Sequence, residues 1–349
     1  MPIDYGPLRS LFNSEEISEI MVNSWNKIFV EHEGLLVETS VKFVDQRQFE
    51  ELIYSILAAD KKNLASALSF DGTLPGGERY NITLPPLTSK GPTITIRKFF
   101  AQNLTFEDLV QKQFLSDKAA HFLKVAVASR ISIVISGGTG SGKTSFLNTL
   151  SGAISKTERV ISIEDVAELR LNHPNWISMQ SVDSERIKLN AKSCLINALR
   201  MRPDRIIVGE CRKDETFEML QAMNMGHDGS MTTIHANSAN DCLSRLESLI
   251  QLNGVELPLK QIRFLMSKAI GLVAQIRRRA DGVREIVDIT EIIGMENDVM
   301  TRACLFERDR SGQLVPTGLV PHLLKKINAN GQVILHSFFD ERSLIKKPA

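Results

Sequence analysis

Two spacings of apolar residues divide the chain into two parts. In the first part, short runs of alternating apolar and polar residues, rich in β-branched side chains, predict strands. These predicted strands are 21–23, 27–31, 35–38, 79–84 and 92–97. Residues 46–61 instead place their apolar side chains on one helical face, and a Ser-Glu-Glu start predicts a short capped helix over residues 14–20. The pattern therefore predicts a small N-terminal α+β domain over residues 1–97.

The second part of the chain alternates strands with helices. Helical spacing occurs over residues 106–110 and 117–128, and apolar strand-like runs follow with helical stretches between them. The predicted strands are 131–136, 159–163, 204–208, 230–234 and 271–277. This alternation is typical of an α/β fold with a mostly parallel sheet. We therefore predict a larger domain over residues 106–349, a hinge or linker at 98–105, and a hairpin edge at the charged tract 276–282.

Composition limits the classes of function. The 349 residues suffice for two domains, and the formal charge of 42 − 41 = +1 disfavours a dedicated nucleic-acid-binding protein. The first residues lack the basic and apolar regions of a secretory signal, and the most apolar stretch, 122–136, is interrupted by Lys124 and Arg130. We therefore expect a soluble cytoplasmic protein. The four cysteines are isolated, which predicts reduced thiols and no zinc site, with Cys211 a candidate redox-sensitive thiol.

The strongest chemical signal is a glycine-rich loop between a predicted strand and a predicted helix. Residues 137–144 fit the pattern G-x-x-x-x-G-K-[ST], in which backbone N–H groups and a helix N-terminus face a phosphate. Lys143 would reach the β- and γ-phosphates, and Thr144 would supply a hydroxyl to Mg²⁺. We therefore predict a nucleotide-binding loop. Its residues are Gly137, Gly138, Thr139, Gly140, Ser141, Gly142, Lys143, Thr144 and Ser145.

Two acidic segments follow strands and are candidates for assisting phosphoryl transfer. Glu164 and Asp165 come directly after the strand 159–163, which we expect next to the strand that precedes the loop. Glu164 is the candidate for polarising the attacking water, and Asp165 is alternatively a cap for the next segment. Glu210 ends a second apolar run, with Gly209 where many ATPases have aspartate. We predict that Glu210 acts on Mg²⁺ through its water ligands or on the attacking water.

Basic side chains complete the candidate set. His235 follows the strand 230–234 and is a candidate sensor of the γ-phosphate, although a histidine in such a place is more often a core residue. Guanidinium groups stabilise the charge that develops in phosphoryl transfer. Arg212 lies two residues after Glu210 and is a candidate for this role or for an interface. Arg79 and Arg97 lie far from the loop in sequence, and composition does not decide whether they reach it.

Four segments occur in the order found in one family of ATPases. They are the loop at 137–144, an aspartate box at 163–169, a Walker B segment at 200–210 and a histidine box at 226–237. Together they resemble the secretion ATPase superfamily, which includes the motors of type II and type IV secretion and of type IV pili. Gly76-Gly77-Glu78-Arg79 and the segment 91–99 are most similar to the CpaF (TadA) branch, which powers the Tad pilus.

The resemblance implies a homo-hexamer of two-domain subunits with a RecA-like C-terminal domain. It implies that ATP and Mg²⁺ bind between the domains, and that hydrolysis drives an inner-membrane platform protein from the cytoplasm, with the ring peripherally associated with the membrane. It assigns charge stabilisation to Arg79 and Arg97, water polarisation to Glu164 and the Walker B role to Glu210. Residues 213–215 are closer to the type II secretion branch, but the zinc-binding cysteine cluster of that branch is absent.

Other functions remain open on the sequence. A RecA-like DNA translocase or helicase shares the loop and the acidic residues, but the near-neutral charge and the lack of an aromatic-basic stripe argue against nucleic acid as a partner. A purely regulatory nucleotide-binding protein would not need Glu164 and Glu210. A GTPase would need Asn-Lys-x-Asp after the loop, whereas Asn26-Lys27 comes before it.

Overall fold

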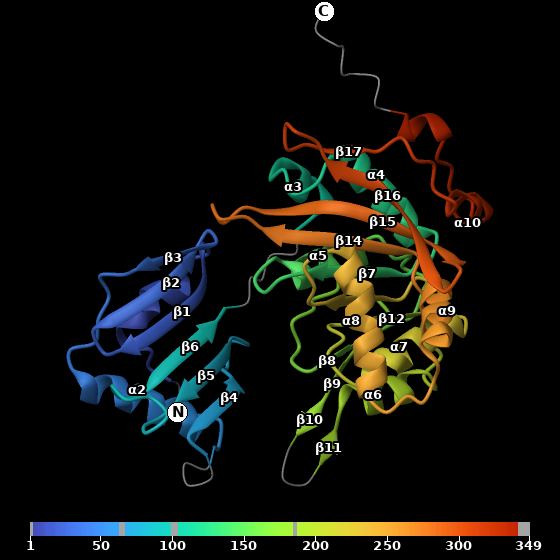
Figure 1. Cartoon of the computed structure of the whole chain (residues 1–349). Helices are drawn as coiled ribbons and strands as arrows, with labels where there is room; N and C mark the ends of the chain where they lie inside the picture. Colours follow the sequence, from blue (N-terminus) through green and yellow to red (C-terminus); the bar gives the residue numbers. More distant parts are fainter. Residues whose placement is uncertain (1–2, 63–66, 99–103, 184–186, 341–349) are drawn as a thin grey trace, which may run out of the picture. The chain divides into compact units, whose positions relative to one another are not determined.

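The computed structural model describes residues 3–62, 67–98, 104–183 and 187–340. The chain forms two compact units, which are described separately here (Figure 1). The N-terminal unit comprises Met1–Gln102 and Ala280–Val283, and the larger unit comprises Asn103–Arg279 and Arg284–Ala349. Of the predicted hinge at 98–105, residues 99–103 lie outside the described part of the chain.

The N-terminal unit is an antiparallel sheet in the strand order β3-β2-β1-β6-β5-β4. The strands are β1 Ile17–Ser24, β2 Lys27–His32, β3 Leu35–Glu38, β4 Ser69–Thr73, β5 Arg79–Thr83 and β6 Thr93–Arg97. The helices are η1 Gly6–Leu8, α1 Arg9–Asn13 and α2 Gln46–Ala59. The helix α2 begins where the Asp45 side chain accepts a hydrogen bond from the Gln48 N–H, and the predicted apolar stripe of α2 packs against the sheet.

The predicted capped helix at 14–20 is wrong. Residues from Ile17 onward form β1, and the short helix α1 ends at Asn13, before the predicted start. The local capping signal is overridden because β1 pairs with strands on both sides. Ile20 lies opposite Val30 of β2 and Ile96 of β6, and all three side chains are buried. Pairing on both edges with burial of alternate side chains outweighs a weak local preference for a helix.

The larger unit is built on a nine-stranded sheet in the order β17-β16-β15-β14-β7-β13-β12-β8-β9. Its parallel part, which confirms the predicted α/β fold, runs from β14 to β9. These strands are β14 Leu272–Arg278, β7 Ile133–Gly137, β13 Met231–Ile234, β12 Arg205–Val208, β8 Val160–Glu164 and β9 Trp176–Gln180. Because they are parallel, their carboxyl ends meet at one edge of the sheet. The segments that follow β7, β8, β12 and β13 therefore leave the sheet on the same side.

Helices cover both faces of this sheet, as Figure 1 shows. Successive side chains of β7 separate into two cores: Ile133 and Ile135 join the first, whereas Val134 joins the second. The first core contains helices α3 Phe106–Gln111, α4 Asp117–Ala128, α5 Lys143–Ser151 and α10 Leu324–Ala329, and the short turn η2 His336–Phe339. The second contains α6 Ala191–Ala198, α7 Glu215–Asn224, α8 Ala239–Leu252 and α9 Leu259–Ala269. A sheet buried on both faces explains the nearly continuous apolar runs in its parallel strands.

An antiparallel extension widens the sheet beyond β14. It consists of β15 Arg284–Glu296, β16 Val299–Arg308 and β17 Leu314–Pro316. The predicted hairpin at 276–282 is confirmed, because β14 pairs with β15 across this turn. The strands β16 and β17 were not predicted. A small ribbon, β10 Val182–Asp183 and β11 Lys188–Leu189, lies outside the main sheet.

A buried arginine joins the amino ends of the parallel strands. Arg205, the first residue of β12, is fully buried, and its guanidinium pairs with Glu158 at 2.6 and 3.1 Å. It also donates to the carbonyl oxygens of Val127 at 2.8 Å and Gly229 at 3.0 Å. Gly229 has a φ of +80°, and a Cβ there would lie 1.9 Å from an Arg205 nitrogen. The buried charge is therefore paired and hydrogen-bonded, which is the condition for tolerating it in a core.

Candidate nucleotide-binding and catalytic site

The glycine-rich loop connects β7 to α5 at the carboxyl edge of the sheet. Gly140 and Gly142 have φ angles of +69° and +92°, which favour glycine. The Ser141 hydroxyl donates to the Gly138 carbonyl oxygen at 2.8 Å. Lys143 is buried and folds back over the loop, where its ammonium group donates to the carbonyl oxygens of Gly137 at 3.0 Å and Gly138 at 2.8 Å. The loop thus has the strand–loop–helix geometry expected of a phosphate-binding loop.

The structure brings three of the predicted side chains together next to this loop. The Lys143 ammonium lies 3.4 Å from Nδ1 of His235, and Nε2 of His235 lies 3.0 Å from Oε1 of Glu210. Sheet order explains the arrangement, because β13 lies between β7 and β12. The loop, His235 and Glu210 therefore follow three adjacent parallel strands.

This chain of contacts fixes the histidine tautomer. An ammonium group can only donate, so Nδ1 of His235 accepts from Lys143 and the proton of the neutral ring sits on Nε2, which lies 3.0 Å from Oε1 of Glu210. Burial, followed by the positive charge of Lys143, lowers the pKa of His235 below its usual 6.5. His235 is therefore neutral at pH 7 and lies between Lys143 and Glu210.

Arg212 joins the same network through Glu210. Its guanidinium pairs with Oε2 of Glu210 at 2.7 Å, and this bond raises the pKa of Arg212. About half of the Arg212 side chain is exposed, so the guanidinium also faces solvent. Each oxygen of Glu210 thus contacts a basic side chain: Oε1 lies next to the His235 imidazole, and Oε2 accepts a hydrogen bond from Arg212.

Glu164 is close to Glu210 but is held differently. It ends β8, which is separated from the loop strand β7 by β12 and β13, so the expectation that its strand lies next to β7 is wrong. Its Oε1 accepts the N–H groups of Glu168 and Leu169, both at 2.9 Å. Its Oε2 is buried with no hydrogen-bond partner among the described residues, and burial raises the pKa of the carboxyl group. Glu164 therefore fixes the segment after β8 with Oε1, and its Oε2 is available to accept a further hydrogen bond.

Gly209 explains how the two acidic residues fit together. A Cβ at Gly209 would lie 3.0 Å from Cγ of Glu164. A side chain at this position, where the Walker B segment of many ATPases has aspartate, would compete with Glu164 for space. The acidic groups of this site therefore come from the ends of two adjacent strands, β8 and β12.

The predicted arginines of the N-terminal part lie in the other unit. Arg79 begins β5 and Arg97 ends β6, and the two residues are directly opposite each other in the antiparallel pair. Arg97 is paired with Glu19 of β1 at 2.6 Å. The structure therefore brings Arg79 and Arg97 to one end of the N-terminal sheet.

Three further arginines near the loop were not predicted. Arg284 of β15 donates from Nε to the Gly140 carbonyl oxygen at 2.8 Å, and Arg278 of β14 lies against the same glycine. Arg245 of α8 contributes to lowering the pKa of His235. Nothing in the sequence pointed to Arg245. The sequence analysis identified 276–282 only as a charged hairpin edge, because nothing local indicates which face of a hairpin meets a loop more than 130 residues earlier in the chain.

The oxygen donors near the loop fit a magnesium ion bound together with a nucleotide. The Thr144 hydroxyl is partly exposed and makes no hydrogen bond within the described part of the chain, and Glu210 lies across from Lys143. Mg²⁺ in such sites is held by one or two protein oxygens, with water and phosphate oxygens supplying the rest. Over the described residues, no group of three or more His, Cys, Asp or Glu side chains is arranged to hold a metal.

Cys211 is not exposed to solvent, although it follows Glu210. Its side chain is fully buried, its thiol contacts the Thr232 hydroxyl at 3.3 Å, and burial raises its pKa to about 12. A thiol that is buried and protonated is unreactive. The proposal of a redox-sensitive Cys211 is therefore not supported by its surroundings.

Comparison with known proteins now places the chain. The family described as "Type II/IV secretion system protein" matches residues 3–304. The chain belongs to this family. The match confirms the predicted superfamily. It also confirms, at the level of the family, the prediction that the chain is an ATPase.

Named relatives and solved structures agree with this family. The conjugal transfer protein TrbB of Rhizobium radiobacter is 34% identical over 285 residues, covering 78% of this chain and 84% of TrbB. The type IV secretion system protein PtlH of Bordetella pertussis is 31% identical over 327 residues, covering 81% and 92%. The ATPase DotB of Legionella pneumophila is 23% identical with a TM-score of 0.59, covering 82% and 81%, and shares the fold. In the described residues, no helix is long and apolar enough to span a bilayer.

Proposed function

We propose that this chain is an ATP-driven motor of a secretion or pilus-assembly system. The observation that carries the proposal is the series of side-chain contacts Lys143–His235–Glu210–Arg212, which starts at a phosphate-type loop and ends at a partly exposed guanidinium. Such a series links the occupancy of the loop to charges two strands away. Family membership supports the same activity.

In this proposal each side chain has a separate task. Residues 137–145 bind the phosphates of ATP, and Lys143 leaves the carbonyl oxygens of Gly137 and Gly138 to reach the β- and γ-phosphates. His235 loses its Lys143 contact at that moment and so reports that the nucleotide is bound. Thr144 and Glu210 would hold Mg²⁺, which supplies neutralisation of phosphate charge when bound. Glu164, whose Oε2 has no hydrogen-bond partner among the described residues, would orient the attacking water.

The remaining parts of the proposal concern assembly. We propose an N-terminal domain over residues 1–97 and a RecA-like ATPase domain over residues 106–349, joined by a hinge at 98–105. Arg79 and Arg97 would stabilise phosphate charge from the N-terminal domain. Subunits would form a homo-hexamer, located in the cytoplasm and peripherally associated with the inner membrane, where a platform protein is the partner. The motifs at 76–79 and 91–99 support the CpaF (TadA) branch, whereas TrbB and PtlH support conjugation or type IV secretion.

The first experiment measures ATP hydrolysis with Mg²⁺ alongside mass by light scattering. Wild type, Lys143→Ala and Glu210→Gln are compared, with Glu307→Gln as a matched control, because Glu307 is an exposed carboxylate on β16. We expect turnover to be lost in Lys143→Ala and Glu210→Gln and unchanged in the control, together with ATP-dependent assembly near six subunits.

Two additions distinguish the motor from its main alternative. Single-stranded DNA is added to one series and membrane vesicles to another. If the protein is a monomer whose ATPase activity DNA stimulates many-fold, the protein is a DNA translocase and not a secretion motor. Normal ATP hydrolysis by Lys143→Ala would show that the glycine-rich loop is not needed for hydrolysis.

A further inference from the structure

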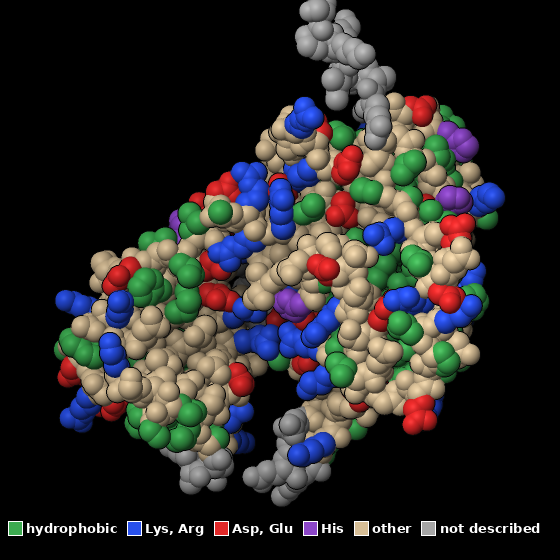
Figure 2. All heavy atoms as spheres, viewed as in Figure 1, with side chains coloured by type: hydrophobic (Ala, Val, Ile, Leu, Met, Phe, Trp, Pro, Cys, Tyr) green, Lys and Arg blue, Asp and Glu red, His purple; other side chains and the backbone are tan. Residues whose placement is uncertain are grey.

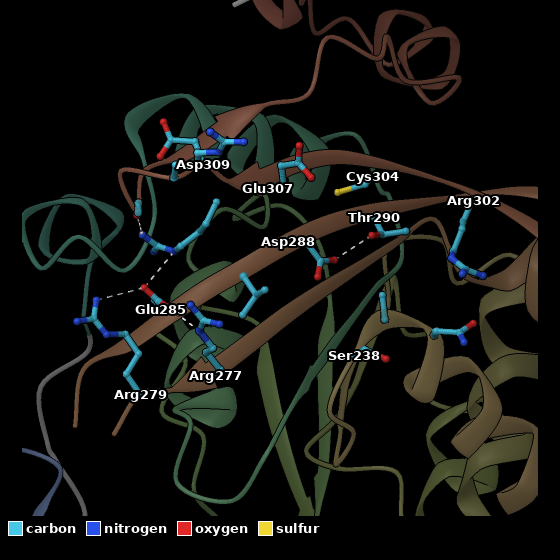
Figure 3. A pocket seen from close by; sticks show the side chains of 16 residues that line it. Ser238, Arg277, Arg279, Glu285, Asp288, Thr290, Arg302, Cys304, Glu307 and Asp309 are labelled. Carbon is cyan, nitrogen blue, oxygen red and sulfur yellow. Dashed lines mark hydrogen bonds and ion pairs between the residues drawn. The ribbon is translucent and has the colours of Figure 1, made fainter. Parts of the chain in front are cut away.

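The β14–β15 hairpin has two chemically different faces. Arg277 lies opposite Glu285, and Figure 3 shows these residues, with Arg279, at one end of a surface hollow of about 680 Å³. Glu285 is buried and pairs with Arg277 at 2.6 Å. Because side chains alternate along a strand, Arg278 and Arg284 point to the other face. The charges that line the hollow are therefore largely neutralised by one another, and the second face is the one that meets the glycine-rich loop.

Arg284 contacts the loop at two glycines. Its Nε–H donates to the Gly140 carbonyl oxygen at 2.8 Å, and its Cδ lies 3.3 Å from where a Cβ of Gly142 would be. Arg278 lies directly opposite Arg284 in the hairpin, with a guanidinium nitrogen 3.1 Å from where a Cβ of Gly140 would be. Both arginines thus lie against the two loop positions whose backbone is left-handed.

The bond to Gly140 determines the direction of the next N–H group. The carbonyl of Gly140 and the N–H of Ser141 belong to one planar trans peptide, so they point in opposite directions. While Arg284 holds the oxygen on its own side of the loop, the Ser141 N–H is turned to the other side. The carbonyl oxygens of Gly137 and Gly138 are bound by Lys143, which has to move when a phosphate enters. Arg284 holds a loop carbonyl independently of that movement.

The facing pair of arginines also has an electrostatic meaning. Like charges directly opposite each other on neighbouring strands are destabilising. Guanidinium groups form strong charge-assisted contacts with phosphate. Figure 2 shows Lys and Arg side chains, with Asp and Glu side chains among them, over this end of β14 and β15. The hairpin therefore brings two positive charges to the edge of the loop.

We propose that Arg284 is a positioning residue for nucleotide binding, which fixes the Gly140–Ser141 peptide with the Ser141 N–H directed at the phosphates. Arg278 adds positive charge on the same face. The inference rests on the proposed phosphate-binding role of residues 137–145. It predicts that the loop is pre-shaped before nucleotide arrives, so that affinity for phosphates depends on a side chain more than 140 residues away in the chain.

The test is a titration with a fluorescent ADP, mant-ADP, and its displacement by inorganic pyrophosphate. Full-length Arg284→Ala, Arg284→Gln and Arg284→Lys are compared with Arg279→Ala, which removes a charge from the same hairpin but from the other face. A hydrogen bond to a charged group is worth roughly tenfold or more in an equilibrium constant. We expect Arg284→Ala to weaken mant-ADP and pyrophosphate alike by roughly tenfold, with KM for ATP rising by the same factor and kcat changing little.

The glutamine and lysine variants decide the mechanism. Glutamine can donate to the Gly140 oxygen without a charge, so a positioning role predicts that Arg284→Gln recovers part of the lost affinity. If Arg284→Gln binds as weakly as Arg284→Ala while Arg284→Lys binds like wild type, the effect is charge alone and the proposal is wrong. Wild-type affinity in Arg284→Ala, or an equal loss in Arg279→Ala, would also overturn it. If wild type does not bind mant-ADP, the proposed nucleotide-binding role of residues 137–145 is itself wrong.

Discussion

Replacing Arg205 by methionine should destabilise the larger unit strongly while leaving its chemistry intact. The substitution removes two bonds to Glu158 and one each to the carbonyl oxygens of Val127 and Gly229. Glu158 is only about 5% exposed and would keep Arg130, at 3.1 Å, as its remaining ion-pair partner among the described residues. Breaking one side of a buried ion pair costs about 3–5 kcal/mol, because the other charge stays buried.

This free energy converts into a measurable shift. For a unit of this size, each kcal/mol lowers Tm by roughly 2–4 °C, so Arg205→Met should lower Tm by roughly 6–20 °C. Arg130→Met is the matched control. Arg130 pairs with the same glutamate, but 40% of its side chain is exposed, so its loss should cost less than about 1 kcal/mol.

Calorimetry and ATPase rates at 20 °C together test the reasoning. Arg205 lies at the amino ends of the strands, and the candidate site lies at their carboxyl ends, so kcat of the folded variant should stay within about twofold of wild type. A double variant, Arg205→Met with Glu158→Gln, should regain part of the lost stability, because neither buried charge is left. If Arg205→Met lowers Tm no more than Arg130→Met, the buried pair does not join these strands as argued.

Three other predictions concern the carboxyl edge of the sheet. Because burial raises the pKa of Glu164 above its usual 4.5, ionised Glu164 costs stability at neutral pH. Glu164→Gln should therefore have a higher Tm than wild type at pH 7.5, and this difference should shrink as pH falls toward 4.5; a lower Tm at pH 7.5 would contradict the raised pKa. If Glu164 orients water, kcat of Glu164→Gln should fall by about 10²-fold or more. Because the pKa of His235 is lowered, the loss of ATPase activity on acidification should occur below pH 6.5 and should disappear in His235→Gln. A loss of activity that begins above pH 6.5 and persists in His235→Gln would exclude His235 as its cause. Blocking exposed thiols with N-ethylmaleimide at pH 7 should leave ATPase activity within about twofold of wild type, because Cys211 is buried with a pKa of about 12; rapid inactivation, retained when the other three cysteines are replaced, would show that Cys211 is accessible.

The sequence predicts best what depends on contiguous residues. The loop at 137–145, the strand before it and the helix after it form one local unit, and each residue type has a direct physical reason to be there. The same holds for α2, whose apolar stripe was predicted from the spacing of its apolar residues. Alternation of strands and helices was sufficient to predict the parallel part of the large sheet.

What the sequence could not provide is the order of strands and the contacts between distant segments. The segment 14–20 carries a local helix signal, and only its pairing with β2 and β6 makes it a strand. Glu164 follows a strand like any other, and nothing in its neighbours shows that two strands separate it from β7. Arg284 lies just after the charged tract 276–282, and its contact with the loop depends on the register of the β14–β15 hairpin.

The shared space of Gly209 and Glu164 has a consequence for redesign. Because a Cβ at 209 would lie 3.0 Å from Cγ of Glu164, introducing the more usual aspartate requires the Glu164 side chain to shift by a few tenths of an ångström. Gly209→Asp combined with Glu164→Ala would instead transplant the carboxylate from one strand to its neighbour. Because the side chains at the two positions compete for the same space, a library that varies them jointly would sample placements of the carboxylate on either strand.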